Sequence, residues 1–269
     1  SVTRARPTLL LVGAGRMGGA LAAGWVAAKL GPIIAVEPRP SAALRKLKGV
    51  SFVSTIEDLP AKRWRACVVA LKPQILRVDA HRLKAIASVG TPMISIAAGT
   101  SIGFLAEQWG KKARIIRAMP NTPGAIGRGI TGLYAAKGAG AKDRRLAEKL
   151  LSALGETLWV GKEAEIDAVT AVSGSGPAYL FLMVEALAAA GAAEGLAADV
   201  AMRLARATMA GAGALLDADK SEAAALRAAV TSRGGTSEAE LTVLMAKDGV
   251  AQMMQRAVAA ARKRAEELG

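Results

Sequence analysis

The chain has 269 residues, is 52% hydrophobic and carries a formal net charge of +14, with one cysteine and one histidine. This length suffices for a sizeable core, and we expect two domains. The lone Cys67 excludes an intramolecular disulfide and suits a reducing, cytoplasmic compartment. The lone His81 argues against a His-based metal site or catalytic triad, and we expect no metal. Every apolar run of about 18 residues is interrupted by charge, so we expect no membrane span.

The positive charge is concentrated in the N-terminal part. Residues 1–163 carry 26 Lys and Arg against 9 Asp and Glu, whereas residues 164–269 carry 10 against 13. An electropositive domain suits a polyanionic partner, either a nucleotide cofactor or a nucleic acid. The 3% aromatic content and the lack of a nucleic-acid motif disfavour nucleic acid. A non-enzymatic dinucleotide sensor or nucleic-acid binder stays open as an alternative.

Short apolar runs alternate with helical patterns over the first part of the chain. We expect a helix over 16–30 and strands at 8–13, 32–37, 50–54, 66–72, 92–98 and 114–119. Such alternation is typical of a parallel sheet covered by helices on both faces. From about residue 163 only Ala-, Leu- and Met-rich helical patterns occur. The predicted domains are therefore 1–162, α/β, and 163–269, all-α.

The segment "GAGRMG" at 13–18 follows a predicted strand and begins a predicted helix. In this context the spacing predicts a dinucleotide site. Gly13 allows a tight turn, Gly15 lets the backbone approach a pyrophosphate, and Gly18 lets helix and strand pack closely. The helix N-terminus offers free N–H groups to the phosphates. The cofactor-binding residues expected here are Gly13, Ala14, Gly15, Arg16, Met17 and Gly18.

The end of the second predicted strand bears on the choice of dinucleotide. Glu37 lies 19 residues beyond Gly18, where an acidic residue bonds ribose hydroxyls and favours NADH. Arg39, beyond Pro38, is able to hold a 2′-phosphate and favours NADPH. Glu37, Pro38 and Arg39 are all expected to contact the cofactor, and the choice between NADH and NADPH stays open.

Three later loops follow predicted strands, at the sheet edge where doubly wound folds bind ligands. The small residues of "SIAAGTS" allow a nicotinamide ring to lie against backbone. Lys72 is either a cofactor contact or a surface charge, and Asn121 bonds either a carboxamide or its own backbone. The cofactor-binding residues expected in these loops are Leu71, Lys72, Pro73, Ala97, Ala98, Gly99 and Asn121.

Two glycine-containing breaks interrupt the helical second part. "SGSGP" at 173–177 predicts a kinked helix, since Pro177 lacks a backbone donor. "VTSRGGTSEAEL" at 230–241 predicts a loop that leads into a helix, with Thr236 and Ser237 as N-caps. Such a helix N-terminus binds carboxylates, although a simple connector is an equally good interpretation of the local sequence.

Together these segments resemble the Δ1-pyrroline-5-carboxylate reductases over nearly the whole chain. The matching stretches are "VGAGRMGGAL", "ALKPQ", "SIAAGTSI", "IIRAMPNTPGAIGRG", "DAVTAVSGSGPAYLFLMVEAL" and "VTSRGGTSEAEL". The resemblance implies an α/β Rossmann domain, with a doubly wound, mostly parallel sheet, followed by an all-α dimerisation domain. It also implies a homodimer, with dimers assembling into a decameric ring. Arg233 departs from the family pattern, where proline is usual, and Ser237 replaces a threonine.

The resemblance further implies reduction of the cyclic imine 1-pyrroline-5-carboxylate to L-proline by NADPH or NADH. Backbone N–H groups of Gly235 and Thr236 would bind the substrate carboxylate. The hydroxyl of Ser237, or of Thr236, would bond the ring nitrogen, so these two are the expected catalytic residues. The implied substrate-binding residues are Ser232, Gly234, Gly235, Thr236, Ser237, Glu163 and Ser175.

A related imine or 3-hydroxyacid dehydrogenase of the same architecture is the second alternative. The hydroxyacid enzymes typically rely on a helix lysine, and "DAVTAVSGSGPAY" at 167–179 contains none.

Overall fold

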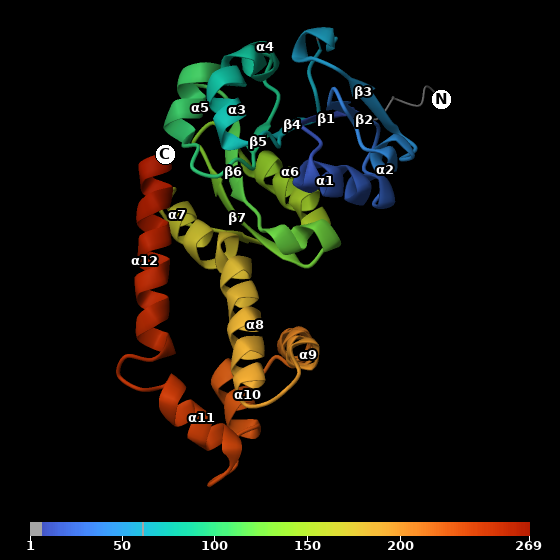
Figure 1. Ribbon diagram of the computed structural model, residues 1–269. Helices are drawn as coiled ribbons and strands as arrows, with labels where there is room; N and C mark the ends of the chain where they lie inside the picture. Colours follow the sequence, from blue (N-terminus) through green and yellow to red (C-terminus); the bar gives the residue numbers. More distant parts are fainter. Residues whose placement is uncertain (1–6, 61) are drawn as a thin grey trace. The chain divides into compact units, whose positions relative to one another are not determined.

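The chain forms two compact units in a computed structural model that describes residues 7–60 and 62–269 (Figure 1). Unit 1 comprises Ser1–Gly174 and Ala261–Gly269, and unit 2 comprises Ser175–Ala260. Residues 1–6 and 61, part of the predicted first domain, lie outside the described residues. The units divide within the helical part of the chain, and the last helix ends in unit 1. The domain boundary at 162/163 stays a prediction.

Unit 1 is built on an eight-stranded, mostly parallel sheet with the strand order β3-β2-β1-β4-β5-β6-β7-β8. β7 runs antiparallel to β6, and the other neighbouring pairs are parallel. The strands are β1 (Leu9–Val12), β2 (Ile33–Val36), β3 (Val50–Val53), β4 (Ala66–Val69), β5 (Met93–Ser95), β6 (Ile115–Met119), β7 (Gly129–Ala135) and β8 (Gly155–Trp159). The doubly wound α/β architecture is confirmed.

Successive residues of a strand point to opposite faces of the sheet. Because these strands are apolar on both faces, helices cover both faces of the sheet. Leu9 and Leu11 of β1 pack in one core with α1 and α6, while Leu10 and Val12 pack in a second core with α3, α4 and α5. The helices of unit 1 are α1 (Arg16–Ala27), α2 (Ala42–Arg45), α3 (Pro73–Asp79), α4 (Lys84–Ser88), α5 (Ile102–Trp109), α6 (Ala141–Leu151) and α7 (Glu165–Val169).

One buried indole in each core anchors its helix through a hydrogen bond. Trp25 of α1 donates through Nε1 to the Leu150 carbonyl at 2.8 Å, and Trp109 of α5 donates to the Ala80 carbonyl at 2.8 Å. The two large side chains are thus buried without leaving an unpaired donor.

The strands β7 and β8 were not among the predicted strands. β7 has the sequence GITGLYA, in which two glycines weaken the pattern of a buried strand. Gly132 lies where a Cβ would come within 2.8 Å of Val169 of α7, so close packing with α7 requires the glycine. The tertiary contact therefore outweighs the weak strand propensity.

Unit 2 is entirely helical in its described residues, as predicted for this part of the chain. Its helices are α8 (Gly176–Ala193), α9 (Ala198–Ala218), α10 (Ala223–Ala229), α11 (Thr236–Leu244) and most of α12 (Val250–Leu268). A π-helical turn at Thr170–Gly174 precedes α8, in the segment predicted to kink.

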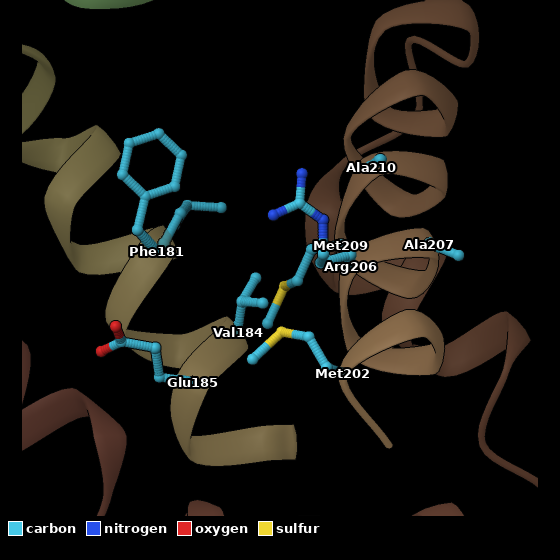
Figure 2. Close-up of a pocket in the computed structure, with 9 residues that line it drawn as sticks. Phe181, Val184, Glu185, Met202, Arg206, Ala207, Met209 and Ala210 are labelled. Carbon is cyan, nitrogen blue, oxygen red and sulfur yellow. The ribbon is translucent and has the colours of Figure 1, made fainter. Parts of the chain in front are cut away.

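α8 and α9 line a solvent-open, largely apolar groove of about 690 Å³ (Figure 2). Val184 of α8 projects toward Met202 and Met209 of α9, whereas the carboxylate of Glu185 points away from α9. Among the described residues, the helical stretch Glu165–Ala193 is long and apolar enough to cross a bilayer by length and composition alone. The core helix of a soluble protein has the same length and composition, so this property alone does not identify a membrane-spanning helix.

Cys67 lies in the central strand β4 with its side chain fully buried. Burial raises the pKa of the thiol well above its usual range, because the thiolate would be desolvated. We predict that Cys67 does not react with a chromogenic disulfide reagent in the native protein and reacts fully in denaturant. Stoichiometric labelling of the folded protein at neutral pH would contradict this burial.

Candidate functional site

Five predicted cofactor segments follow five adjacent parallel strands of unit 1. Loops after β2, β1, β4, β5 and β6 begin at Glu37, Gly13, Ala70, Ile96 and Pro120 respectively. Since parallel strands end at the same sheet edge, these loops line one edge of the sheet. The predicted cofactor residues are therefore gathered at this edge by the strand order.

The Gly13–Gly18 turn has the backbone geometry that a dinucleotide turn needs. Gly13 has φ +90°, and a Cβ there would lie 2.8 Å from the Ala70 carbonyl oxygen. A Cβ on Gly18 would lie 2.3 Å from the Gly13 carbonyl oxygen. Gly15 is the N-cap of α1 and has no side-chain cap, and open space surrounds its Cβ position. The turn thus presents the uncapped N-terminus of α1 to a space that a phosphate is able to enter.

A cavity of about 530 Å³ lies beside this turn. Both oxygens of Glu37 accept backbone N–H groups, Oε2 from Ala14 and Oε1 from Arg39, each at 3.1 Å. Glu37 therefore joins the turn to the end of β2. Exposed arginines, Arg16 and Arg39, contribute positive charge to the lining. The cavity is lined by Ala14, Gly15, Arg16, Gly19, Ala23, Glu37, Arg39, Ser41, Ala43, Leu44 and Leu47.

The loops after β4 and β5 combine an exposed lysine with a fixed backbone. Lys72 is exposed and is the N-cap of α3, followed by Pro73. Gly99 is buried with φ +61°, and its carbonyl accepts a hydrogen bond from Arg77 at 3.2 Å. A Cβ on Gly99 would lie 2.9 Å from Cβ of Leu268, so the end of α12 packs on this loop.

Asn121 bonds the backbone of a residue nine positions away rather than its own backbone. Its Oδ1 accepts the Ile130 N–H at 3.0 Å, which closes the loop between β6 and β7. The side chain therefore orders local backbone, and a carboxamide contact stays a prediction.

Arg117, inside β6, is absent from the predicted site. It is 3% exposed and donates to Glu163 at 3.1 Å and to Asp167 at 3.4 Å. Glu163 also accepts the Ile102 N–H at 2.7 Å. The sequence carries a signal for this cluster, since Arg117 is a charged residue within the apolar run "RIIRAM". A charged side chain buried in a sheet needs partners of opposite charge.

The predicted substrate loop, residues 232–237, lies in unit 2 together with Ser175. Gly234 has φ +72°, and its N–H donates to Glu238 Oε2 at 2.5 Å. The Gly235 N–H donates to the Ser232 carbonyl at 3.0 Å, so one of the two amides expected to bind a carboxylate is engaged in the turn.

The N-cap of α11 is Gly235, so the prediction that Thr236 and Ser237 cap this helix is wrong. Thr236 and Ser237 are instead its first two residues, because the turn that ends at Gly235 sets the helix start. No side-chain cap bond closes this N-terminus in the part of the chain that the structure describes. Backbone N–H groups of the first turn are thereby left to a ligand or to water.

The chain matches the family model of pyrroline-5-carboxylate reductase dimerisation over residues 163–268. A pyrroline-5-carboxylate reductase of Pseudomonas aeruginosa is 37% identical over 265 residues, which cover 97% of each chain.

Solved structures of similar proteins agree with this match. A pyrroline-5-carboxylate reductase from Coxiella burnetii superposes with a TM-score of 0.90 at 32% identity, covering 98% of this chain and 99% of that one. A Plasmodium falciparum pyrroline carboxylate reductase with NADP bound gives a TM-score of 0.81 at 28% identity, covering 99% and 100%.

The two glycines of the α1 turn are expected to respond differently to an added methyl group. We predict that Gly18→Ala lowers the free energy of unfolding by about 1–3 kcal/mol, the usual cost of overpacking. Gly15→Ala should cost less than about 1 kcal/mol but weaken dinucleotide binding about tenfold, because its Cβ enters the cavity. Denaturant unfolding and fluorescence titration measure the two effects. Equal destabilisation by both variants would refute the assignment.

Proposed function

Because this chain belongs to the pyrroline-5-carboxylate reductases, we propose that its Gly13–Gly18 turn binds the nicotinamide dinucleotide and its loop 232–237 binds the cyclic imine. The enzyme is an NAD(P)H-dependent oxidoreductase of proline biosynthesis that reduces 1-pyrroline-5-carboxylate to L-proline. The observation that carries the site assignment is the open, uncapped N-terminus of α1 at Gly15, beside a cavity with two arginines.

The lining of the cavity supports NADPH as the preferred dinucleotide. Both Glu37 oxygens already accept backbone N–H groups, which reduces their capacity for ribose hydroxyls. Arg39 and Ser41 line the same cavity, where a guanidinium and a hydroxyl suit a 2′-phosphate. The remaining proposed cofactor contacts are Ala14, Arg16, Met17, Pro38, Leu71, Lys72, Pro73, Ala97, Ala98, Gly99 and Asn121.

The first turn of α11 supports binding of the substrate carboxylate. The N–H groups of Thr236 and Ser237 lie at an uncapped helix N-terminus, where the helix dipole favours an anion. Since the Gly235 N–H is engaged, we assign the carboxylate to these two amides. The exposed Arg233 adds a cation beside them. Ser232, Gly234 and Gly235 shape the loop, and Ser175 stays a proposed substrate contact.

Reduction of a cyclic imine needs a hydride on carbon and a proton on nitrogen. When bound, the reduced nicotinamide supplies the hydride. The Ser237 hydroxyl bonds the ring nitrogen and orients the protonated imine, with Thr236 as the second candidate. A protonated imine is already a strong electrophile, so positioning supplies most of the catalysis and no strong side-chain base is required.

The dimerisation region explains the exposed apolar helices of unit 2. Leu180, Phe181 and Leu182 of α8 are each at least half exposed in the single chain. An apolar surface of this kind marks an interface, and the family match identifies residues 163–268 as the dimerisation region of a homodimer. We further propose a decameric ring of dimers and a cytoplasmic location.

Purified protein should oxidise NADPH at 340 nm only when 1-pyrroline-5-carboxylate is present. We predict that Arg39→Ala raises KM for NADPH about tenfold and leaves KM for NADH nearly unchanged, since only NADPH carries the 2′-phosphate. Lys29→Ala, a change outside the proposed cavity, is the control. A parallel rise for both nucleotides would exclude recognition of the 2′-phosphate by Arg39.

Loss of the Ser237 hydroxyl tests the catalytic assignment. We predict that Ser237→Ala lowers kcat/KM for the imine by about tenfold or more, as expected for a bond used in the transition state. Thr242→Ala, which removes a hydroxyl bonded to the Glu238 carbonyl in the same helix, should leave it unchanged. Wild-type kinetics for Ser237→Ala would remove this residue from the mechanism.

A further inference from the structure

We propose that Arg117 and Glu163 are positioning residues, which hold the N-terminus of α5 and thereby the loop Ala97–Ser101 in the conformation that the dinucleotide requires. This inference rests on the proposed function, because it assigns a cofactor contact to that loop. It gives Glu163 an indirect role in place of the substrate contact implied by the family resemblance.

Arg117, which is itself buried, is the centre of an ionic cluster whose two carboxylates are partly exposed. It pairs with Ser95 of β5 on one side and with Tyr134 of β7 on the other, so its strand is interior to the sheet. Its Nη1 lies 3.1 Å from Glu163 Oε1, and its Nη2 lies 3.4 Å from Asp167 Oδ1. A buried guanidinium is retained only with such partners, so the segment 163–167 is tied to β6.

Glu163 extends this cluster to α5. The oxygen that binds Arg117, Oε1, also accepts the N–H of Ile102, the first residue of α5, at 2.7 Å. Ser101 is the N-cap and accepts the Phe104 N–H at 3.2 Å. A carboxylate at this position also interacts favourably with the helix dipole. Two first-turn amides of α5 are therefore satisfied, one of them by a side chain 61 residues away.

The loop between β5 and α5 is held at both ends and in the middle. At its start, Ser95 Oγ accepts the Ala97 N–H at 3.4 Å, and at its end Glu163 holds Ile102. In the middle, the Gly99 carbonyl accepts from Arg77. Because the loop is short, release of Ile102 is expected to displace Ala97–Gly99, whose backbone is the proposed nicotinamide contact.

Graded substitutions of Glu163 separate this role from direct substrate binding. Glu163→Ala removes both bonds, whereas Glu163→Gln keeps an oxygen that accepts from Ile102. We predict that Glu163→Ala raises the dissociation constant for NADPH, titrated by tryptophan fluorescence without substrate, by about tenfold, the order expected for loss of a charge-assisted hydrogen bond. Glu163→Gln should raise it less. At saturating NADPH, KM for the imine should change less than about twofold.

Arg114→Lys is the matched control. Arg114 precedes β6 at its other end, where it pairs with Asp143 and donates to the Gly90 carbonyl at 2.7 Å. This change disturbs a comparable ion pair away from the loop and should leave the NADPH dissociation constant unchanged. Thermal unfolding of each variant identifies any that fail to fold. The partly exposed Glu163 makes Glu163→Gln the variant least subject to that failure.

The outcomes distinguish this inference from the proposed function. If wild-type protein does not reduce 1-pyrroline-5-carboxylate, the proposed function fails, whatever the variants do. If the wild type is active and Glu163→Ala raises KM for the imine without changing the NADPH dissociation constant, Glu163 contacts substrate directly and the positioning role is refuted. If Glu163→Ala leaves both the NADPH dissociation constant and KM for the imine unchanged, the positioning role is refuted as well.

Discussion

Burial of β1 on both faces is the constraint on which the proposed dinucleotide site depends. Leu9, Leu10, Leu11 and Val12 are at most 1% exposed, and the strand is hydrogen-bonded between β2 and β4. The chain therefore leaves the sheet in one tight turn after Val12 and continues directly into α1, which packs against a face of the same sheet. Only glycine satisfies the left-handed φ and the close backbone contacts of that turn. An uncapped helix N-terminus beside an open cavity follows from this packing.

A second constraint is the charge that β6 carries into the same sheet. An arginine buried among apolar strands requires carboxylate partners, and both come from the segment 163–167. Through Glu163 the requirement reaches the first amide of α5. One buried charge thus connects three elements that are distant in sequence, and this connection is the basis for the proposed positioning of the loop that leads into α5.

Unit 2 follows a different principle, since much of its apolar surface is not buried within one chain. α8 has one buried residue, Ala188, and exposes large side chains on several sides. A sequence this apolar is stable in water only when a partner covers it, which agrees with the match to a dimerisation family. Oligomerisation is therefore part of the fold of this region, and its surface is not an independent site.

The sequence by itself determined the features that depend on local order: the glycine turn at Gly13–Gly18, the alternation of buried strands and helices, the kink before α8 and the family resemblance carried by these motifs. Only the tertiary structure decided that β7 and β8 are strands, that Gly235 caps α11, that Asn121 holds Ile130, and that Ala261–Gly269 belongs to unit 1. It also decided the partners of Glu163, which lie 46 and 61 residues away. Backbone propensity and hydrophobic period act over a few residues, whereas pairing of buried charges and glycine contacts depends on segments that folding brings together.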